Sequence, residues 1–317
     1  MTSTGMSATF TPKDVIALLR PHQWIKNIVV FAGPAAGMKL SDPHSLVNAC
    51  VAFAAFCLAA SAVYAINDTI DREADARHPT KCRRPIARGA ITPGAAIMIA
   101  VALVTLAFSL PAVLLNQQVT IIIVIYFTMM LAYSLALKNR VILDVIILAT
   151  GFVLRAIAGA EAVDVVASQW LIACVFTLCL FFGFGKRRCE ITMIGNAESA
   201  GHHRVTLLRY TSDLLNHLIT VSAAVAIMTF LLYTVEVSRV PSLFHKEYLF
   251  YTLPIVVYGV FRYAMLTELG IHTGPTEIII KDKMMVASIG LWLLIALGIV
   301  YHDPLFRWMG WHAWVWG

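Results

Sequence analysis

The chain has 317 residues, of which 59% are hydrophobic and only 13% are charged. A soluble globular domain carries roughly 45–50% apolar and about 25% charged residues, so this composition excludes a water-soluble globule. The net charge of +6 would point to nucleic acid in a soluble protein. In a chain this apolar, excess lysine and arginine instead mark cytoplasmic loops, and no nucleic-acid partner is expected.

Apolar segments predict an all-α, polytopic membrane protein, because a spanning helix needs about 20 mostly apolar residues. A short first segment, Ile28–Met38, is interrupted by Gly33, Pro34 and Gly37, which predicts a broken or tilted helix. Eight longer segments follow, and with the first they give about nine spanning helices. These eight are Leu46–Ile66, Ala95–Leu115, Val119–Leu137, Val141–Val163, Val165–Gly185, Leu214–Val235, Tyr248–Leu266 and Met284–Tyr301.

Basic residues orient these helices in the membrane. Most of the 24 lysines and arginines fall in loops on one side if the N-terminus is cytoplasmic, and Arg155 lies within a span. The positive-inside rule therefore predicts a cytoplasmic N-terminus and a C-terminus on the opposite face. We expect a cytoplasmic segment over residues 1–23, a single transmembrane catalytic domain over 24–302 and a Trp-rich interfacial tail over 303–317.

The loop after the second apolar segment reads NDTIDREADARHPTKCRRPIARG. It carries Asn67, Asp68, Asp71 and Asp75, and on a helix that continues from the span the three aspartates share one face. Like charges on one face repel each other unless a cation lies between them. Oxygen ligands without His or Cys favour Mg²⁺. The sequence therefore predicts a magnesium site, with a solvated helix end as the alternative.

Basic residues follow at once in the same loop, among them Lys81 and Arg84. Such side chains bind phosphate oxygens through charge-assisted hydrogen bonds, although charge that merely sets the topology would also explain them. Carboxylates for a metal followed by cations for phosphates predict a diphosphate bound at the membrane surface, with Asp68, Asp71 and Asp75 as the catalytic carboxylates.

The pattern NDxxDxxxD followed by RPIARG resembles the UbiA superfamily of intramembrane prenyltransferases. The resemblance covers nearly the whole chain and implies about nine helices around a central cavity, with Mg²⁺ holding a diphosphate. Typical members that prenylate aromatic rings carry a second motif, DxxxD, after the sixth helix. Here that loop reads FGFGKRRCEI, with Glu190 as its carboxylate, so the resemblance does not extend to a second metal site.

Further segments, LLRPHQWIKN, YSLALK, LRAIAG and GKRRCE, are similar to one branch of this superfamily. That branch joins phosphoribosyl pyrophosphate (PRPP) to a polyprenyl phosphate and releases pyrophosphate. The resemblance implies that the diphosphate on the metal belongs to the sugar donor and that the lipid is the acceptor.

Arg155 lies roughly in mid-span, where a charge costs at least about 2.5–3.5 kcal/mol and should face an internal cavity. The resemblance around LRAIAG favours a phosphate contact, and a structural pair with Glu161 is the alternative. Lys26 and Lys138 would complete, with Lys81, a ring of ammonium groups around the donor's phosphates. Lys138 would also suit a lysine that extends to the membrane interface.

Two tyrosines are further predicted to bind substrate. Tyr64 lies three residues before Asn67 on the same side of the helix, so its phenol would bond a ribose or phosphate oxygen. An interfacial tyrosine is the alternative there, and Tyr133 belongs to the YSLALK segment. In place of the second acidic motif, a basic loop would bind the lipid phosphate; its predicted residues are Lys186, Arg187 and Glu190.

Together with the resemblance, the sequence predicts a Mg²⁺-dependent transferase that passes 5-phosphoribose from PRPP to a decaprenyl-type phosphate. It would act at the cytoplasmic face of a bacterial-type inner membrane and serve cell-envelope glycan synthesis; both a monomer and a homo-oligomer fit. One alternative is an aromatic prenyltransferase that uses a prenyl diphosphate for quinone-type synthesis. Another is a transporter, whose carboxylates should lie near mid-membrane rather than after a complete span.

Overall fold

The computed structural model describes residues 11–195, 210–238, 248–271 and 274–302, so the predicted tail lies outside the described residues. Within these ranges every regular element is a helix, and eight helices are long and apolar enough to cross a membrane. The chain is therefore an all-α, multi-pass membrane protein. The long helices are α3 (Pro43–Ile70), α5 (Pro93–Leu114), α6 (Gln117–Leu135), α7 (Leu143–Glu161), α8 (Gln169–Gly195), α9 (Ser212–Ser238), α10 (Leu253–Leu269) and α12 (Lys283–Val300).

Short helices lie between and before them. The first apolar segment is irregular, as predicted: a 3₁₀ helix runs through Phe31 and one short α-helix follows to Ala36. Whether it crosses the membrane stays a prediction. The short elements are α1 (Pro12–Leu19), η1 (Pro21–Phe31), α2 (Ala32–Ala36), η2 (Lys39–Ser41), α4 (Arg72–Arg77), η3 (Lys81–Arg83), η4 (Leu137–Asn139) and α11 (Pro275–Lys281).

Helix starts in this chain follow local capping chemistry. The N-cap side chains of Thr92, Asn116 and Asp282 accept hydrogen bonds from the backbone N–H three residues further on, at 3.3, 2.8 and 2.8 Å. Each bond satisfies a donor that the first helical turn leaves unpaired. Helix ends differ more from the sequence prediction, since α8 continues beyond Gly185 to Gly195. Hydropathy marks the membrane crossing, whereas helical hydrogen bonds continue into the polar region.

The chain forms two compact units. One contains the described residues up to Pro34, Pro43–Lys138 and Leu154–Val165, and the other contains Ala35–Asp42, Asn139–Val153 and the described residues from Val166. Helix α7 therefore contributes its first part to the second unit and its last part to the first.

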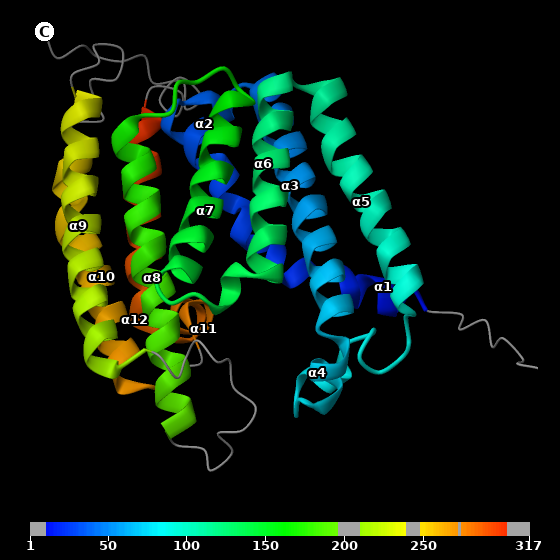
Figure 1. Cartoon of the computed structure of the whole chain (residues 1–317). Helices are drawn as coiled ribbons and strands as arrows, with labels where there is room; N and C mark the ends of the chain where they lie inside the picture. Colours follow the sequence, from blue (N-terminus) through cyan, green and yellow to red (C-terminus); the bar gives the residue numbers. More distant parts are fainter. Residues whose placement is uncertain (1–10, 196–209, 239–247, 272–273, 303–317) are drawn as a thin grey trace, which may run out of the picture. The chain divides into compact units, whose positions relative to one another are not determined.

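Small residues dominate the core of the first unit. Helix α3 packs against α5 and α6 (Figure 1), and its buried face includes Ala52, Ala55 and Ala59. Between helices in lipid, close packing rather than burial from water drives association, and small side chains let backbones approach. Phe56 of α3 completes this core against Tyr126 of α6, with ring centroids 5.1 Å apart.

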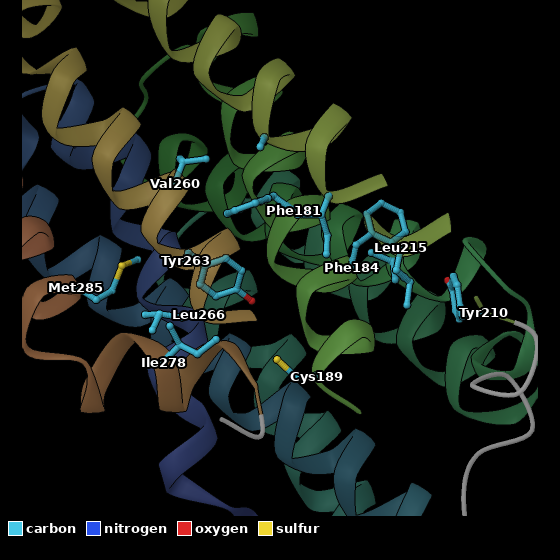
Figure 2. Close-up of a cluster of buried hydrophobic side chains, with 13 residues drawn as sticks. Phe181, Phe184, Cys189, Tyr210, Leu215, Val260, Tyr263, Leu266, Ile278 and Met285 are labelled. Atoms are coloured by element: carbon cyan, nitrogen blue, oxygen red, sulfur yellow. The ribbon is translucent and has the colours of Figure 1, made fainter. Parts of the chain in front are cut away.

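Aromatic side chains build the core of the second unit (Figure 2). Phe181 of α8 and Tyr263 of α10 lie with ring centroids 4.9 Å apart. Leu215 of α9 and Ile278 of α11 are fully buried in the same cluster. This packing fixes the polar end of α8, which carries the predicted residues Lys186, Arg187 and Glu190, against α11.

Candidate active site

The acidic motif lies where α3 passes into α4. Helix α3 ends at Ile70 and α4 begins at Arg72. The N–H of Asp71 nevertheless donates to the carbonyl of Asn67 at 2.9 Å, and the N–H of Asp75 donates to the carbonyl of Asp71 at 2.8 Å. Helical hydrogen bonds therefore continue through the junction, and the backbone sets the direction of each side chain.

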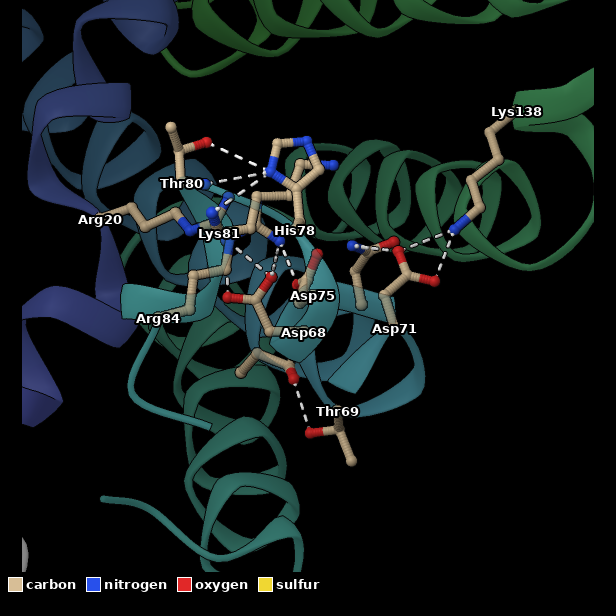
Figure 3. Close-up of polar contacts among 12 residues, drawn as sticks. Arg20, Asp68, Thr69, Asp71, Asp75, His78, Thr80, Lys81, Arg84 and Lys138 are labelled. Atoms are coloured by element: carbon tan, nitrogen blue, oxygen red, sulfur yellow. Dashed lines mark hydrogen bonds and ion pairs between the residues drawn. The ribbon is translucent and has the colours of Figure 1, made fainter. Parts of the chain in front are cut away.

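Asp68 and Asp75 form the buried half of the motif (Figure 3), with side chains only 2% and 4% exposed. Nη1 of Arg84 bridges them, at 2.9 Å from Oδ1 of Asp68 and 2.5 Å from Oδ2 of Asp75. Nη2 of Arg20 donates to both carboxylate oxygens of Asp68 at 2.6 Å. Two guanidinium groups thus neutralise the two buried carboxylates. Without these partners, the buried charges would strongly destabilise the fold.

Asn67 and Asp71 form the open half. Figure 3 shows Asp71 directed away from Asp68 and toward Lys138 of η4, whose Nζ lies 2.9 Å from both carboxylate oxygens. Nδ2 of Asn67 donates to Oδ2 of Asp71 at 3.1 Å. The Asp71 side chain is 31% exposed, so solvent and ligands reach it.

The single acidic face predicted from the spacing is therefore divided in two. Across the described ranges, no group of three His, Cys, Asp or Glu side chains could hold a metal ion. The four-ligand magnesium site stays a prediction, and the geometry favours a narrower donor set. Asn67 and Asp71 adjoin each other and supply hard oxygens, and Mg²⁺ commonly uses one or two carboxylates with water and substrate phosphate. These two residues fit that chemistry.

The basic stretch after α4 also divides by burial. Nδ1 of His78 accepts the backbone N–H groups of Thr80 and Lys81, at 3.3 and 3.4 Å, and so shapes the turn that precedes η3. Lys81 is exposed to solvent. Arg84 instead bonds both buried carboxylates, so its predicted role in substrate binding stays a prediction.

Arg155 is buried in the first unit among polar and aromatic groups. Its Nε donates to Oδ1 of Asn27 at 2.7 Å, and Nη2 donates to the hydroxyl of Tyr126 at 2.8 Å. The guanidinium also lies over the Tyr126 ring, 4.6 Å from its centroid. Hydrogen-bond acceptors and a ring face reduce the cost of a charge at membrane depth.

The remaining predicted donor-site residues also lie in the first unit. The Tyr64 ring lies 5.0 Å from the guanidinium of Arg20, Tyr133 is buried in α6, and Lys26 is partly exposed on η1. Their roles in substrate binding stay predictions.

In the second unit, the basic end of α8 is held by carboxylates. Arg187 is buried, its Nη1 donates to Oε2 of Glu190 at 2.5 Å, and its Nε lies 2.9 Å from Oδ2 of Asp144. Lys186 is 47% exposed and lies 3.8 Å from Glu190. Of the two predicted cations, Lys186 is therefore the accessible one and Arg187 the buried one.

Tyr210 extends this cluster. Its hydroxyl donates to Oδ1 of Asp144 at 2.9 Å and accepts the N–H of Ile142 at 2.6 Å. Burial raises the pKa of the Tyr210 phenol, and the negative charge of Asp144 raises it further. The phenol therefore stays protonated and acts as a donor. Ile142 itself has a φ of +66°, which is strained for a β-branched residue and is fixed by this hydrogen bond.

Sequence reasoning missed several of these residues, namely Arg20, Asn27, Tyr126 and Tyr210. Arg20 lies 48 positions from Asp68, Asp144 lies 66 from Tyr210, and Asn27 lies 128 from Arg155. Pairings at such distances leave no local pattern. The one available indication was a polar or charged residue beside an apolar run, as with Arg20 and Asn27.

Comparison with known proteins identifies the family of this chain. The family model for the UbiA prenyltransferase family matches residues 28–270. The chain belongs to this UbiA family. A decaprenyl-phosphate phosphoribosyltransferase of Corynebacterium glutamicum is 32% identical over 92% of this chain and 88% of its own length. Another, from Mycolicibacterium smegmatis, is 34% identical over 89% of this chain and 92% of its own length.

Solved structures agree on the fold. A UbiA homologue from Archaeoglobus fulgidus, bound to DMAPP and Mg²⁺, is similar with a TM-score of 0.70 over 90% of this chain and 99% of that chain. At 15% identity this likeness concerns the fold alone. The predicted UbiA membership is confirmed, and the protein is a membrane-embedded transferase.

Proposed function

We propose that this UbiA transferase moves 5-phosphoribose from PRPP to a polyprenyl phosphate of the decaprenyl type and releases pyrophosphate. Two relatives with the matching name support it, each more than 30% identical over most of both chains. The observation that carries the donor site is the contact of Asn67, Asp71 and Lys138 at the end of a spanning helix. A carboxylate, an amide oxygen and an ammonium suit a diphosphate with its metal.

We assign a divalent cation, Mg²⁺ by its preference for hard oxygens, to Asn67 and Asp71. Bound there, it would neutralise charge on the leaving pyrophosphate. Asp68 and Asp75 would assist from the buried side of the motif. The Mg²⁺ in the A. fulgidus homologue supports divalent metal use in the family.

The chain's own cations would bind the donor. Lys138, beside Asp71, would contact the phosphates, and Lys26, Lys81 and Arg155 would add positive charge. The leaving group gains charge as the C1–O bond of PRPP lengthens, so fixed cations favour the transition state over the bound donor. The hydroxyls of Tyr64 and Tyr133 would bond ribose or phosphate oxygens.

The acceptor would bring its own nucleophile. A phosphate monoester has a second pKa of about 6, so the lipid phosphate is anionic near neutral pH and needs no general base. One of its oxygens forms the new bond to C1 as the bond to pyrophosphate breaks, and the electron pair leaves with pyrophosphate. We assign the lipid phosphate to Lys186, with Arg187 and Glu190 holding the end of α8 through their ion pair.

Orientation and cellular role follow the sequence prediction. We place the site at the cytoplasmic face of a bacterial-type inner membrane, because most basic residues share its side, and we assign the product to cell-envelope glycan synthesis.

A direct transfer assay tests the donor. Purified protein in detergent, supplied with PRPP labelled in the ribose, polyprenyl phosphate and Mg²⁺, should give a labelled lipid and one pyrophosphate per transfer. The matched reaction supplies a prenyl diphosphate and an aromatic acid instead. Product only in the matched reaction would replace this proposal with the aromatic prenyltransferase.

A further inference from the structure

Arg20 occupies a constrained position between α1 and η1. Its φ and ψ are 54° and 59°, a left-handed conformation that costs free energy for a residue with a side chain, and Pro21 follows it. Its N–H donates to the carbonyl of Ile16 and ends α1. This turn is one that the surrounding structure must enforce.

Three contacts with the rest of the first unit enforce it. Leu18 is fully buried in a cluster with residues of α3 and α5. The hydroxyl of Ser61 in α3 donates to the carbonyl of Leu19 at 2.8 Å and accepts the indole N–H of Trp24 at 3.1 Å. The backbone on both sides of Arg20 is therefore tied to α3, and its side chain starts from a fixed point.

The guanidinium of Arg20 is directed at Asp68 (Figure 3). The two hydrogen bonds at 2.6 Å engage both oxygens of a carboxylate that is only 2% exposed. The other guanidinium on Asp68, that of Arg84, is shared with Asp75. Loss of Arg20 would leave a buried carboxylate with half of one partner, so the last turn of α3 would have to move.

That turn carries the open half of the motif. Asn67 directly precedes Asp68, and the backbone N–H of Asp71 donates a hydrogen bond to the carbonyl of Asn67. We propose that Arg20 is a positioning residue for the diphosphate site: by holding Asp68 it fixes the direction of Asn67 and Asp71. What this site binds rests on the proposed function, whereas the positioning itself is tested without a substrate.

The test measures binding of Mn²⁺ alone to the purified protein by electron paramagnetic resonance. In Arg20→Ala we expect the dissociation constant to rise about tenfold or more, as for other residues that orient metal ligands. Arg88→Ala is the matched control, because Arg88 also ties α1 to the segment after α4, through Asp14. Mn²⁺ affinity in this control should stay within about twofold of wild type, since the hydrogen bonds to Asp68 and Asp75 come from Arg20 and Arg84 and not from Arg88.

A double variant separates positioning from direct binding. Arg20→Ala/Asp68→Asn should bind Mn²⁺ no more weakly than the worse single variant, because both changes break the same contact. Its melting temperature should exceed that of Arg20→Ala, because the unpaired charge is gone. Kinetically, Arg20→Ala should require more Mg²⁺ for half-maximal rate.

Three outcomes would overturn the proposal: unchanged Mn²⁺ affinity in Arg20→Ala, an equal loss in Arg88→Ala, or additive losses in the double variant. Unchanged Mn²⁺ affinity together with a higher KM for PRPP would make Arg20 a direct donor ligand. A wild-type protein that binds Mn²⁺ but transfers nothing from PRPP would refute the proposed function and leave the positioning role standing. No Mn²⁺ binding by wild type would refute the positioning role, while the transfer assay would still decide the proposed function by itself.

Discussion

At the scale of single residues, Asp71 and Asp75 differ in what surrounds their charges. Asp71 is partly exposed beside Lys138, and such a pair contributes about 0–1 kcal/mol to stability. Asp75 is 4% exposed against Arg84, and breaking a buried pair costs about 3–5 kcal/mol. We therefore expect Asp71→Asn to fold and insert normally while its rate of pyrophosphate release falls about 100-fold or more.

Asp75→Asn is the matched variant, with the same change of one atom. It should lower the melting temperature in detergent clearly more than Asp71→Asn does. The measurements are pyrophosphate release with saturating Mg²⁺ and thermal unfolding of each variant. Full turnover in Asp71→Asn would remove this residue from the site, and equal melting temperatures would contradict the division into buried and open halves.

The sequence could predict that these residues act together, but not how they divide. Spacing of three and four placed the aspartates near one another, and oxygen chemistry indicated a hard metal. Which carboxylate is buried depends on Arg20 and Arg84, which reach it from other parts of the fold. Likewise, the sequence predicted a phosphate contact for Arg187, which stays a prediction, but gave no indication of its ion pair with Asp144, 43 residues earlier.

At the scale of elements, the first apolar segment and α7 approach each other through glycines. A Cβ on Gly159 would lie 1.7 Å from the carbonyl oxygen of Val30, and one on Gly33 would lie 2.6 Å from the Cβ of Ala160. Backbone against backbone leaves no flexible side chain to move aside. Gly159→Ala should therefore destabilise the protein by about 1–3 kcal/mol, as overpacking does.

Gly290→Ala is the control for this prediction. A Cβ there meets nothing within 4 Å, and Gly290 lies inside α12, where alanine favours helix. Thermal unfolding should show a lower melting temperature for Gly159→Ala and an equal or higher one for Gly290→Ala. A Gly159→Ala protein as stable as wild type would mean that the two elements are not in close contact.

Elements were more predictable than their contacts. Runs of about 20 apolar residues identified each long helix, because lipid demands both length and apolarity. Gly33 and Pro34 indicated that the first apolar segment is irregular. Nothing in the sequence indicated that Gly159 faces Val30, since a glycine in a spanning helix has many uses.

At the scale of the whole molecule, the first segment decides whether the two ends of the chain lie on the same side of the membrane. Eight spans return the chain to the side where it began, and a ninth places its ends on opposite sides. A 3₁₀ helix rises about 2.0 Å per residue and an α-helix about 1.5 Å, so η1 and α2 together extend roughly 30 Å. The hydrocarbon core of a bilayer is about 30 Å thick, so the two elements would cross it only if they were collinear. The segment also contains Lys26, which we assign to the donor at the membrane surface, and its crossing stays a prediction.

Labelling of single cysteines in intact cells tests this topology. Ala17 precedes the first segment, Ser41 follows it, and both are exposed. In a chain without its native cysteines, Ser41→Cys should react with a membrane-impermeant maleimide from outside, whereas Ala17→Cys should react only after the membrane is permeabilised. The matched chain keeps only Cys82, beside the acidic motif, and should react only after the membrane is permeabilised. If Ala17→Cys also reacts in intact cells, the first segment does not cross the membrane, and both ends of the chain lie outside. Labelling of Cys82 in intact cells would contradict the predicted orientation, because the same lysines and arginines orient every loop. The diphosphate site would then lie outside, away from cytoplasmic PRPP.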